Sequence, residues 1–119
     1  MAEMNLAEKI AKILYNKKAL DITVLHVGHM TVITDYMVIA TGTSAPQVKA
    51  LCETVEDELA KADVFARRRE GVNDGHWCVL DYGDVMVHVF HEQDREYYQL
   101  ERLWADGTNE VQVDYDAEA

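Results

Sequence analysis

The sequence predicts one α/β domain, in which a mixed β-sheet of about five strands has helices packed on its faces. Apolar residues recur at helical spacing in three stretches, within residues 6–14, 48–59 and 97–104. Short apolar and β-branched runs lie between these stretches, and helices that alternate with strands imply a sheet covered by helices. The chain has 119 residues, 49% of them hydrophobic, so it can bury one substantial core.

The first half of the chain is expected to contain two helices and two strands. A helix over 6–18 comes first, followed by a β-branched strand over 22–27. The nearly continuous apolar run 36–41 predicts a strand that is covered on both faces. Ser44 and Gln47 have the spacing of a capping box, which predicts the start of the second helix. The buried side of this helix is expected to consist of Val48, Leu51, Cys52, Val55 and Leu59.

The second half is expected to hold a short strand within 62–69, a hairpin over 77–91 and one helix over 92–104. The inner side of that helix is expected to consist of Tyr97, Leu100, Leu103 and Trp104. From residue 105 onward the chain has five acidic residues and no basic one. We therefore expect the domain to span 1–105 and residues 106–119 to form a frayed acidic tail.

The hairpin is the most informative segment. Two apolar runs flank a turn at 81–84 whose residues are Asp, Tyr, Gly and Asp, and Gly83 supplies the backbone freedom of a tight turn. Tyr82 at such a turn is not needed for folding, and Trp77 stands at the base of the hairpin. The residues alone leave two interpretations open for Trp77, an anchor in a protein interface or a side chain of the core.

The charge balance limits the classes of partner. Acidic residues outnumber basic ones by 22 to 11, for a formal net charge of −11, and phosphate backbones repel such a surface. The charge either steers the domain onto a basic protein or only keeps it in solution. The one basic cluster, Arg67–Arg69, is expected to form a solvated edge with Glu70 nearby rather than to bind RNA.

The cysteines and the hydropathy pattern bear on the compartment. Cys52 and Cys78 are expected to be buried free thiols in a reducing environment. No apolar run approaches the ~20 residues of a membrane span, and the N-terminal residues are typical neither of a signal peptide nor of a transit peptide. A cytoplasmic protein without a membrane segment is therefore expected.

An enzymatic interpretation rests on a glycine-containing loop and two carboxylates. The loop Thr41–Ser44 precedes a helix and can present backbone N–H groups to a phosphate, while Asp81 and Asp84 can hold magnesium. Nucleotidyltransferases combine such a loop with a pair of Asp two residues apart on a neighbouring strand. Here the spacing is three across a turn, and the loop lacks a P-loop lysine. A helix cap and a plain turn are the favoured interpretation.

Other catalytic or metal-binding patterns are absent from the sequence. The five histidines lack the i, i+4 spacing of a zinc-binding helix, and no Cys-x-x-Cys pair occurs. Ser44 is the only serine and stands at a helix cap, outside any nucleophile motif. We expect no catalytic residue, no metal and no cofactor.

Long blocks of the sequence resemble the ribosomal silencing factor family RsfS, also called Iojap. The resemblance runs in order from about residue 5 to residue 105. The blocks are Asp21–Leu25, Thr31 with Asp35–Ser44, Gln47–Ala50, Glu70–Gly71, Trp77–Phe90 and Tyr97–Trp104.

The resemblance implies a fold similar to nucleotidyltransferases without their activity. It implies a cytoplasmic bacterial factor that binds large-subunit ribosomal protein fourteen and blocks joining of the small subunit, with at most a peripheral contact to ribosomal RNA. Family members can also form homodimers. The expected contacts with the ribosomal protein are Trp77, Leu80, Asp81, Tyr82, Gly83, Asp84 and His88. The alternative remains a nucleotidyltransferase-like enzyme that uses Asp81, Asp84 and the Thr41–Ser44 loop.

Overall fold

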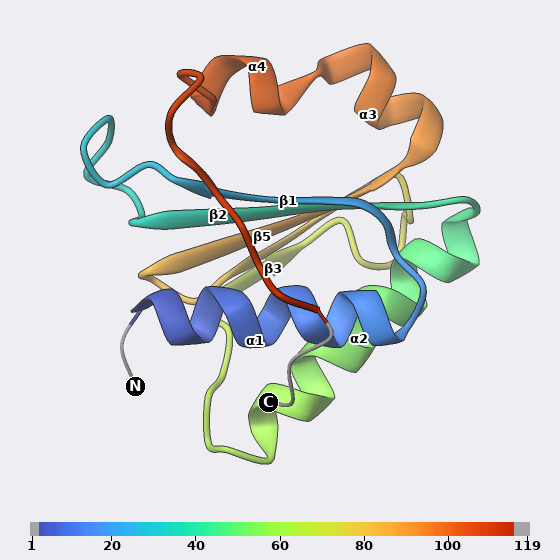
Figure 1. Cartoon of the computed structure of the whole chain (residues 1–119). Coiled ribbons are helices and arrows are strands. Elements are labelled where there is room, and N and C mark those ends of the chain that lie inside the picture. The colour runs from blue at the N-terminus through green and yellow to red at the C-terminus, as the bar shows by residue number, and fades with distance from the viewer. Residues whose placement is uncertain (1–2, 116–119) are drawn as a thin grey trace.

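A six-stranded mixed sheet lies between two layers of helices in the computed structural model of the chain, which describes residues 3–115 (Figure 1). The strand order is β3-β4-β5-β2-β1-β6, with β2 and β5 parallel and the other neighbours antiparallel. The strands are β1 Leu20–His26, β2 Tyr36–Gly42, β3 Arg68–Glu70, β4 Trp77–Asp81, β5 Val85–His91 and β6 Glu110–Val111. The predicted mixed sheet with helices on its faces is confirmed, with six strands where about five were expected.

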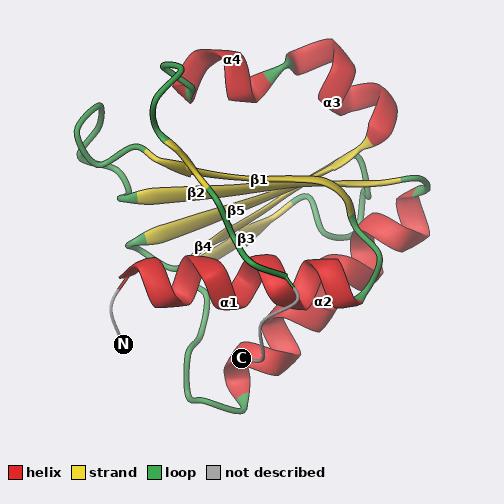
Figure 2. Cartoon of the chain, viewed as in Figure 1, coloured by secondary structure: helices red, strands yellow, loops and turns green. Residues whose placement is uncertain are grey.

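The two helix layers cover opposite faces of the sheet (Figure 2). Helices α1 (Glu3–Asn16) and α2 (Ala45–Ala60) pack on one face, and the short helices α3 (Glu92–Tyr98) and α4 (Leu100–Trp104) lie on the other. The larger apolar cluster lies under α1 and α2, where alternate strand residues such as Val85, Val87 and Val89 are fully buried. No described helix is long and apolar enough to cross a membrane.

The start of α2 follows the predicted capping chemistry. Ser44 Oγ accepts a hydrogen bond from Gln47 N at 3.2 Å, and Pro46 stands in the first turn. The Gln47 side chain reaches back to Thr43, whose backbone N and Oγ1 donate to Gln47 Oε1 at 2.6 and 2.9 Å. The five residues predicted for the buried side of this helix are those that the structure buries.

The two cysteines are buried as expected, but they are not free. A disulfide joins Cys52 on α2 to Cys78 on β4, so the prediction of two free thiols is wrong. The apolar side of α2 packs on the face of β4 to which Cys78 points. Twenty-six positions separate the two residues, and only this packing brings them together.

The predicted single helix over 92–104 is divided in two. Gln99 adopts a left-handed conformation with φ 48° and ψ 48°, which ends α3 and turns the chain before α4. Of the expected inner residues, Leu100 is buried and Trp104 packs against the second apolar cluster, whereas Tyr97 and Leu103 are exposed. Because the chain changes direction at Gln99, the four residues predicted to share one buried side of a single helix do not lie on one side.

Part of the segment expected to fray is folded against the domain. Strand β6 pairs with β1 through Val111 and Glu110, and the Tyr115 ring stacks on Tyr15 of α1 with centroids 4.5 Å apart. The prediction of a frayed tail from residue 106 is therefore wrong for the paired residues, and residues 116–119 lie outside the described part of the chain. The pairing depends on backbone N–H and C=O groups, so the acidic side chains of this segment do not prevent it.

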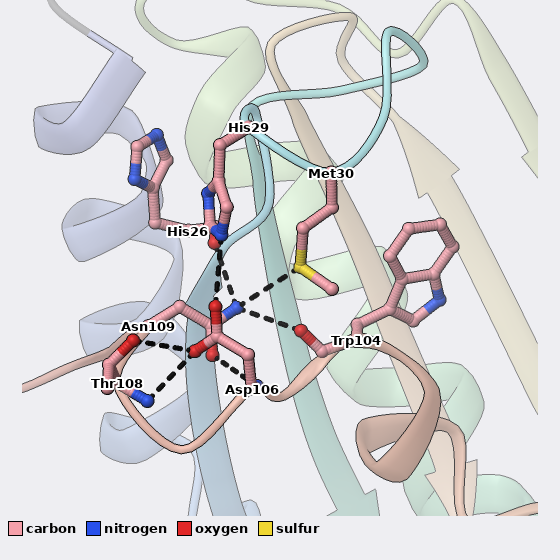
Figure 3. A network of polar contacts seen from close by, with 7 residues as sticks. All are labelled: His26, His29, Met30, Trp104, Asp106, Thr108 and Asn109. Carbon is pink, nitrogen blue, oxygen red and sulfur yellow. Dashed lines mark hydrogen bonds and ion pairs between the residues drawn. The ribbon is translucent and has the colours of Figure 1, made fainter.

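Asn109 fixes this segment through its amide side chain (Figure 3). Its Nδ2 donates to the carbonyl oxygens of His26 at 2.9 Å and of Trp104 at 2.8 Å, and its Oδ1 accepts from Asp106 N at 2.9 Å. Asn109 is buried, and these contacts satisfy groups at the end of α4 and at the end of β1. The C-terminal segment thus fastens α4 to the sheet.

Candidate protein-binding surface

The hairpin β4–β5 has one face that the helices leave partly open. Cys78 and Leu80 of β4 point toward α1 and α2, whereas the alternate residues of the strand point to the opposite face. On that opposite face the second apolar cluster occupies β1, β2 and the end of β5, with Leu100 of α4 above it. The remaining part of this face is partly exposed. We define the open face as Trp77, Val79, Asp81, Met86 and Tyr98.

Trp77 lies at one end of the open face within a cluster of aromatic rings. Its ring stacks on Phe90, its cross-strand neighbour, with centroids 4.9 Å apart, and Tyr98 of α3 lies at 5.1 Å. The Trp77 indole N–H donates to His88 Nδ1 at 3.1 Å. Trp77 is partly buried, so the structure combines the two interpretations that the sequence left open: one part of the ring packs on the core, and another remains accessible.

His88 lies under the Trp77 ring and fixes its orientation through a hydrogen bond. The imidazole is 5% exposed, and burial lowers its pKa to about 4, so it is neutral near pH 7. Because Nδ1 accepts the indole N–H, the proton of the neutral ring resides on Nε2. That Nε2 is buried and has no hydrogen-bond partner among the described residues. His88 therefore holds the tryptophan in one orientation.

The tip of the hairpin is built as a tight turn. Gly83 has φ +86°, a conformation that favours glycine, and its N–H donates to Asp81 Oδ1 at 2.8 Å. A Cβ at Gly83 would lie 2.7 Å from the Arg67 guanidinium. Asp81 therefore stabilises the turn and is partly buried, whereas Asp84 is exposed.

Tyr82 is partly buried and packs against the core rather than standing free at the tip. Its ring packs against the larger apolar cluster, and its hydroxyl is enclosed without a hydrogen-bond partner among the described residues. Burial raises the pKa of Tyr82 to about 12, with a smaller contribution from Glu56. Tyr82 thus contributes packing to the domain, which the sequence did not predict.

The arginine cluster is largely occupied by internal ion pairs. Arg69 forms a bidentate ion pair with Glu56 of α2. Its Nε donates to one carboxylate oxygen of Glu56 at 2.7 Å, and an Nη donates to the other at 3.0 Å. Arg68 Nε lies 3.9 Å from Asp81 Oδ2. All three arginines are exposed, which agrees with the expected solvated edge.

The parts of the alternative enzymatic site lie at opposite ends of the sheet. Strands β2 and β5 are parallel, with Tyr36 beside Val85 and Gly42 beside His91. The Thr41–Ser44 loop follows the end of β2, whereas Asp81 and Asp84 precede the start of β5, about 20 Å away at ~3.3 Å per residue. Within residues 3–115 there is no cluster of His, Cys, Asp and Glu that suits a metal ion. The structure does not bring this loop and these carboxylates together.

A polar pocket of about 770 Å³ lies instead beside Thr41, between β1 and α3. Arg95 fills its floor and donates to Thr41 Oγ1 at 2.9 Å, to Thr23 Oγ1 at 3.1 Å and to the Asp21 carbonyl oxygen. Arg95 is buried, and its Nε lies 3.6 Å from Glu101 Oε1. Arg95 therefore ties α3 to the sheet.

Comparison with known proteins identifies the family. The family model described as "Ribosomal silencing factor during starvation" matches residues 2–119. The chain belongs to the RsfS family. Its RsfS relatives include the ribosomal silencing factor of Haemophilus influenzae, 40% identical over 102 residues, which cover 86% of this chain and all of that protein. The Bacillus subtilis factor is 37% identical over 91 residues, 76% of this chain and 77% of that protein.

A solved structure agrees with this assignment. The crystal structure of a protein from Chromobacterium violaceum superposes with a TM-score of 0.85 at 34% sequence identity, over 95% of this chain and 96% of that one. The RsfS resemblance found in the sequence is thus confirmed.

The seven contacts implied by the RsfS resemblance do not form one continuous surface. Trp77 and Asp81 lie on the open face, Gly83 and Asp84 lie at the tip, and Tyr82 packs against the larger apolar cluster. Leu80 is fully buried beneath α1 and α2, and His88 lies under Trp77, so neither is available for direct contact. The sequence did not single out Val79, Met86 or Tyr98 for this face. Strand alternation places Val79 with Trp77, but the approach of Tyr98 requires the tertiary fold.

Proposed function

We propose that this chain represses translation by binding large-subunit ribosomal protein fourteen with its open face, and that it thereby blocks joining of the small ribosomal subunit. Membership of the RsfS family implies a ribosomal silencing function. The finer assignment rests on one observation, a partly exposed aromatic and apolar surface at Trp77, Val79 and Met86 that folding leaves uncovered.

The chemistry of the open face suits a basic protein partner. Aromatic residues and methionine are enriched in interface centres, and Trp77 is held in one orientation by His88 and Phe90, so it loses little freedom on binding. Asp81 and Asp84 lie at the border of the surface, and the chain has a net charge of −11. Ribosomal proteins are basic, so this charge favours their approach.

Steric exclusion is sufficient for the proposed repression. An interface of ordinary size, about 1,600 Å², holds a bulky domain on the subunit surface without any chemistry. No catalytic residue, metal or cofactor is required. The homodimer, the cytoplasmic location and the nucleotidyltransferase-like topology stay predictions of the family resemblance.

A charge-insertion variant tests the proposal. Met86→Lys places a cation on the open face opposite Asp81, and we expect loss of co-sedimentation with purified large subunits. Ala50→Lys is the matched control, because Ala50 is exposed on α2, on the other side of the sheet. The control should sediment with the subunits and inhibit their joining as the unchanged chain does.

Two results would contradict the proposal. One is free pairing of small subunits with large subunits that are saturated with this protein. The other is equal retention of binding by Met86→Lys and Ala50→Lys, which would place the contact elsewhere on the molecule.

A further inference from the structure

A loop at one end of the sheet presents apolar side chains to solvent. Residues 27–35 connect β1 to β2, and within them Met30, Val32 and Ile33 are 41%, 103% and 63% exposed. Isolated apolar residues are ordinary on a protein surface, but three within four positions concentrate exposed apolar area on one loop. Because these side chains are largely in water, they add little to the stability of the fold. We call residues 30–33 the apolar loop.

Hydrogen bonds hold the apolar loop in one shape although it lacks regular secondary structure. The backbone N–H groups of Met30 and Thr31 donate to the Val27 carbonyl oxygen at 2.9 and 3.1 Å. Ile33 N donates to Thr31 Oγ1 at 3.2 Å, and the next residue, Thr34, is buried. A loop that is ordered before binding loses less conformational entropy when it binds.

The C-terminal segment braces the same loop from the side (Figure 3). Asp106 Oδ2 lies 3.1 Å from His29 Nε2, and Asn109 Nδ2 lies 3.8 Å from Met30 Sδ. Asp106 is itself fixed, because its Oδ1 accepts from both N and Oγ1 of Thr108 at 2.8 Å. The segment that fastens α4 to the sheet therefore also positions the apolar loop.

The apolar loop continues the edge of the proposed binding surface. The backbone N–H groups of Asp35 and Tyr36 both donate to the Asp84 carbonyl oxygen at 3.0 Å, which joins the end of the loop to the tip of the hairpin. A groove of about 410 Å³ separates the two, and it is lined by Val32, Ile33 and Arg67 together with the tip. Met86 stands two residues beyond Asp84, so the open face, the tip and the apolar loop follow one another along the molecule.

We propose that the apolar loop is a second contact with the basic ribosomal protein, inserting Val32 and Ile33 into an apolar depression whose rim carries Lys or Arg. This inference rests on the proposed function. The carboxylates of Asp35 and Asp84 at the groove match such a rim, with Arg67 as the single base in the lining. The same carboxylates repel phosphate, which favours a protein over RNA as the occupant.

A double variant of the full chain tests the second contact. Val32→Ser/Ile33→Ser should raise the Kd for purified large subunits about tenfold or more, since two apolar side chains no longer leave water on binding. Phe65→Ser is the matched control, because Phe65 is 67% exposed and does not line the groove, and its Kd should not change. Both variants should keep the thermal midpoint of the unchanged chain, since the side chains that they remove are exposed.

The outcomes separate this inference from the proposed function. If the double variant binds as the unchanged chain does while Met86→Lys does not bind, the second contact is overturned and the open face stands. If the unchanged chain fails to bind large subunits, both proposals fall. A parallel titration uses the isolated basic ribosomal protein and protein-free large-subunit RNA. Weakened binding to the RNA alone would overturn the assignment to a protein, and weakened binding to the protein alone would support it.

Discussion

The two faces of the β4–β5 hairpin differ in what they contain, although the same two strands, of five and seven residues, build both. Toward α1 and α2 the hairpin presents Cys78, Leu80 and Val87, all apolar and fully enclosed. Away from these helices it presents Trp77, His88 and Met86, which include a titratable ring and a partly exposed indole. The first face therefore has the composition and the burial of a hydrophobic core.

The difference separates the residues that fold the domain from those available for recognition. A second layer of helices of full length would bury the whole outer face, but α3 and α4 have only seven and five residues, and they cover β1, β2 and the end of β5 near Phe90. The accessible part of the outer face is thus a consequence of short helices. Experiments that remove one residue at a time from each face test this division.

The largest expected effect is on stability at the covered face. Leu80→Ala leaves a cavity in the enclosed core and should lower the free energy of unfolding by about 2–5 kcal/mol. Met86→Ala, at the same hairpin but on the open face, should cost about 1 kcal/mol or less. Urea denaturation of both variants measures the contrast. Equal losses would show that the two faces contribute alike to folding.

A smaller effect is expected from acid, through the ring beneath Trp77. In the unfolded chain His88 titrates near its ordinary pKa of 6.5, whereas burial lowers the pKa to about 4 in the folded protein. The unfolded state therefore binds the proton first, so stability is lost as the pH falls from about 6.5 to about 4, by at most about 3 kcal/mol. Denaturant titrations at pH 7 and pH 4.5 measure this loss.

His88→Phe is the control for the acid effect. The substitution keeps a ring of similar size but removes the titrating group, so the contribution of this site to the pH slope should disappear. An unchanged slope in the variant would assign the acid sensitivity to other groups.

The smallest effect concerns the rate of encounter with the ribosome. If the net charge of −11 steers the domain toward a basic partner, the association rate should fall as salt rises from low to physiological concentration, by about tenfold. Stopped-flow binding to large subunits at several salt concentrations measures it. A rate that is independent of salt would mean that the charge of the border residues only keeps the protein in solution.

The elements with local signals were accessible from the sequence. Ser44 and Gln47 define the start of α2 by chemistry that acts within four residues, and Gly83 marks a turn that needs φ above zero. The buried residues of α2 repeat at helical spacing, so their common face needs no tertiary information. These predictions hold because cause and consequence are neighbours in the chain.

Most of the errors concern residues whose partners are distant in sequence, and one concerns a local turn that lacks a glycine. Asn109 satisfies the carbonyl oxygen of His26 across 83 positions, and the acidic composition around it hides that role. The left-handed turn that divides the last helix occurs at Gln99, so no glycine marks its position in the sequence. In the candidate site, strand alternation predicts which hairpin residues share a face but not that Tyr82 reaches the core or that Tyr98 covers Trp77. Those facts depend on how the helices dock.

The outermost strands have a consequence for the protein at high concentration. At one edge β3 has only three residues, all charged and exposed, and Glu56 holds the middle one, Arg69, against α2. At the other edge β6 has two residues. Edge strands this short, one of them wholly charged, are poor templates for the addition of strands from a second copy, so the sheet resists growth into aggregates. The molecule can thus keep the open face accessible for binding without forming polymers through its edge strands.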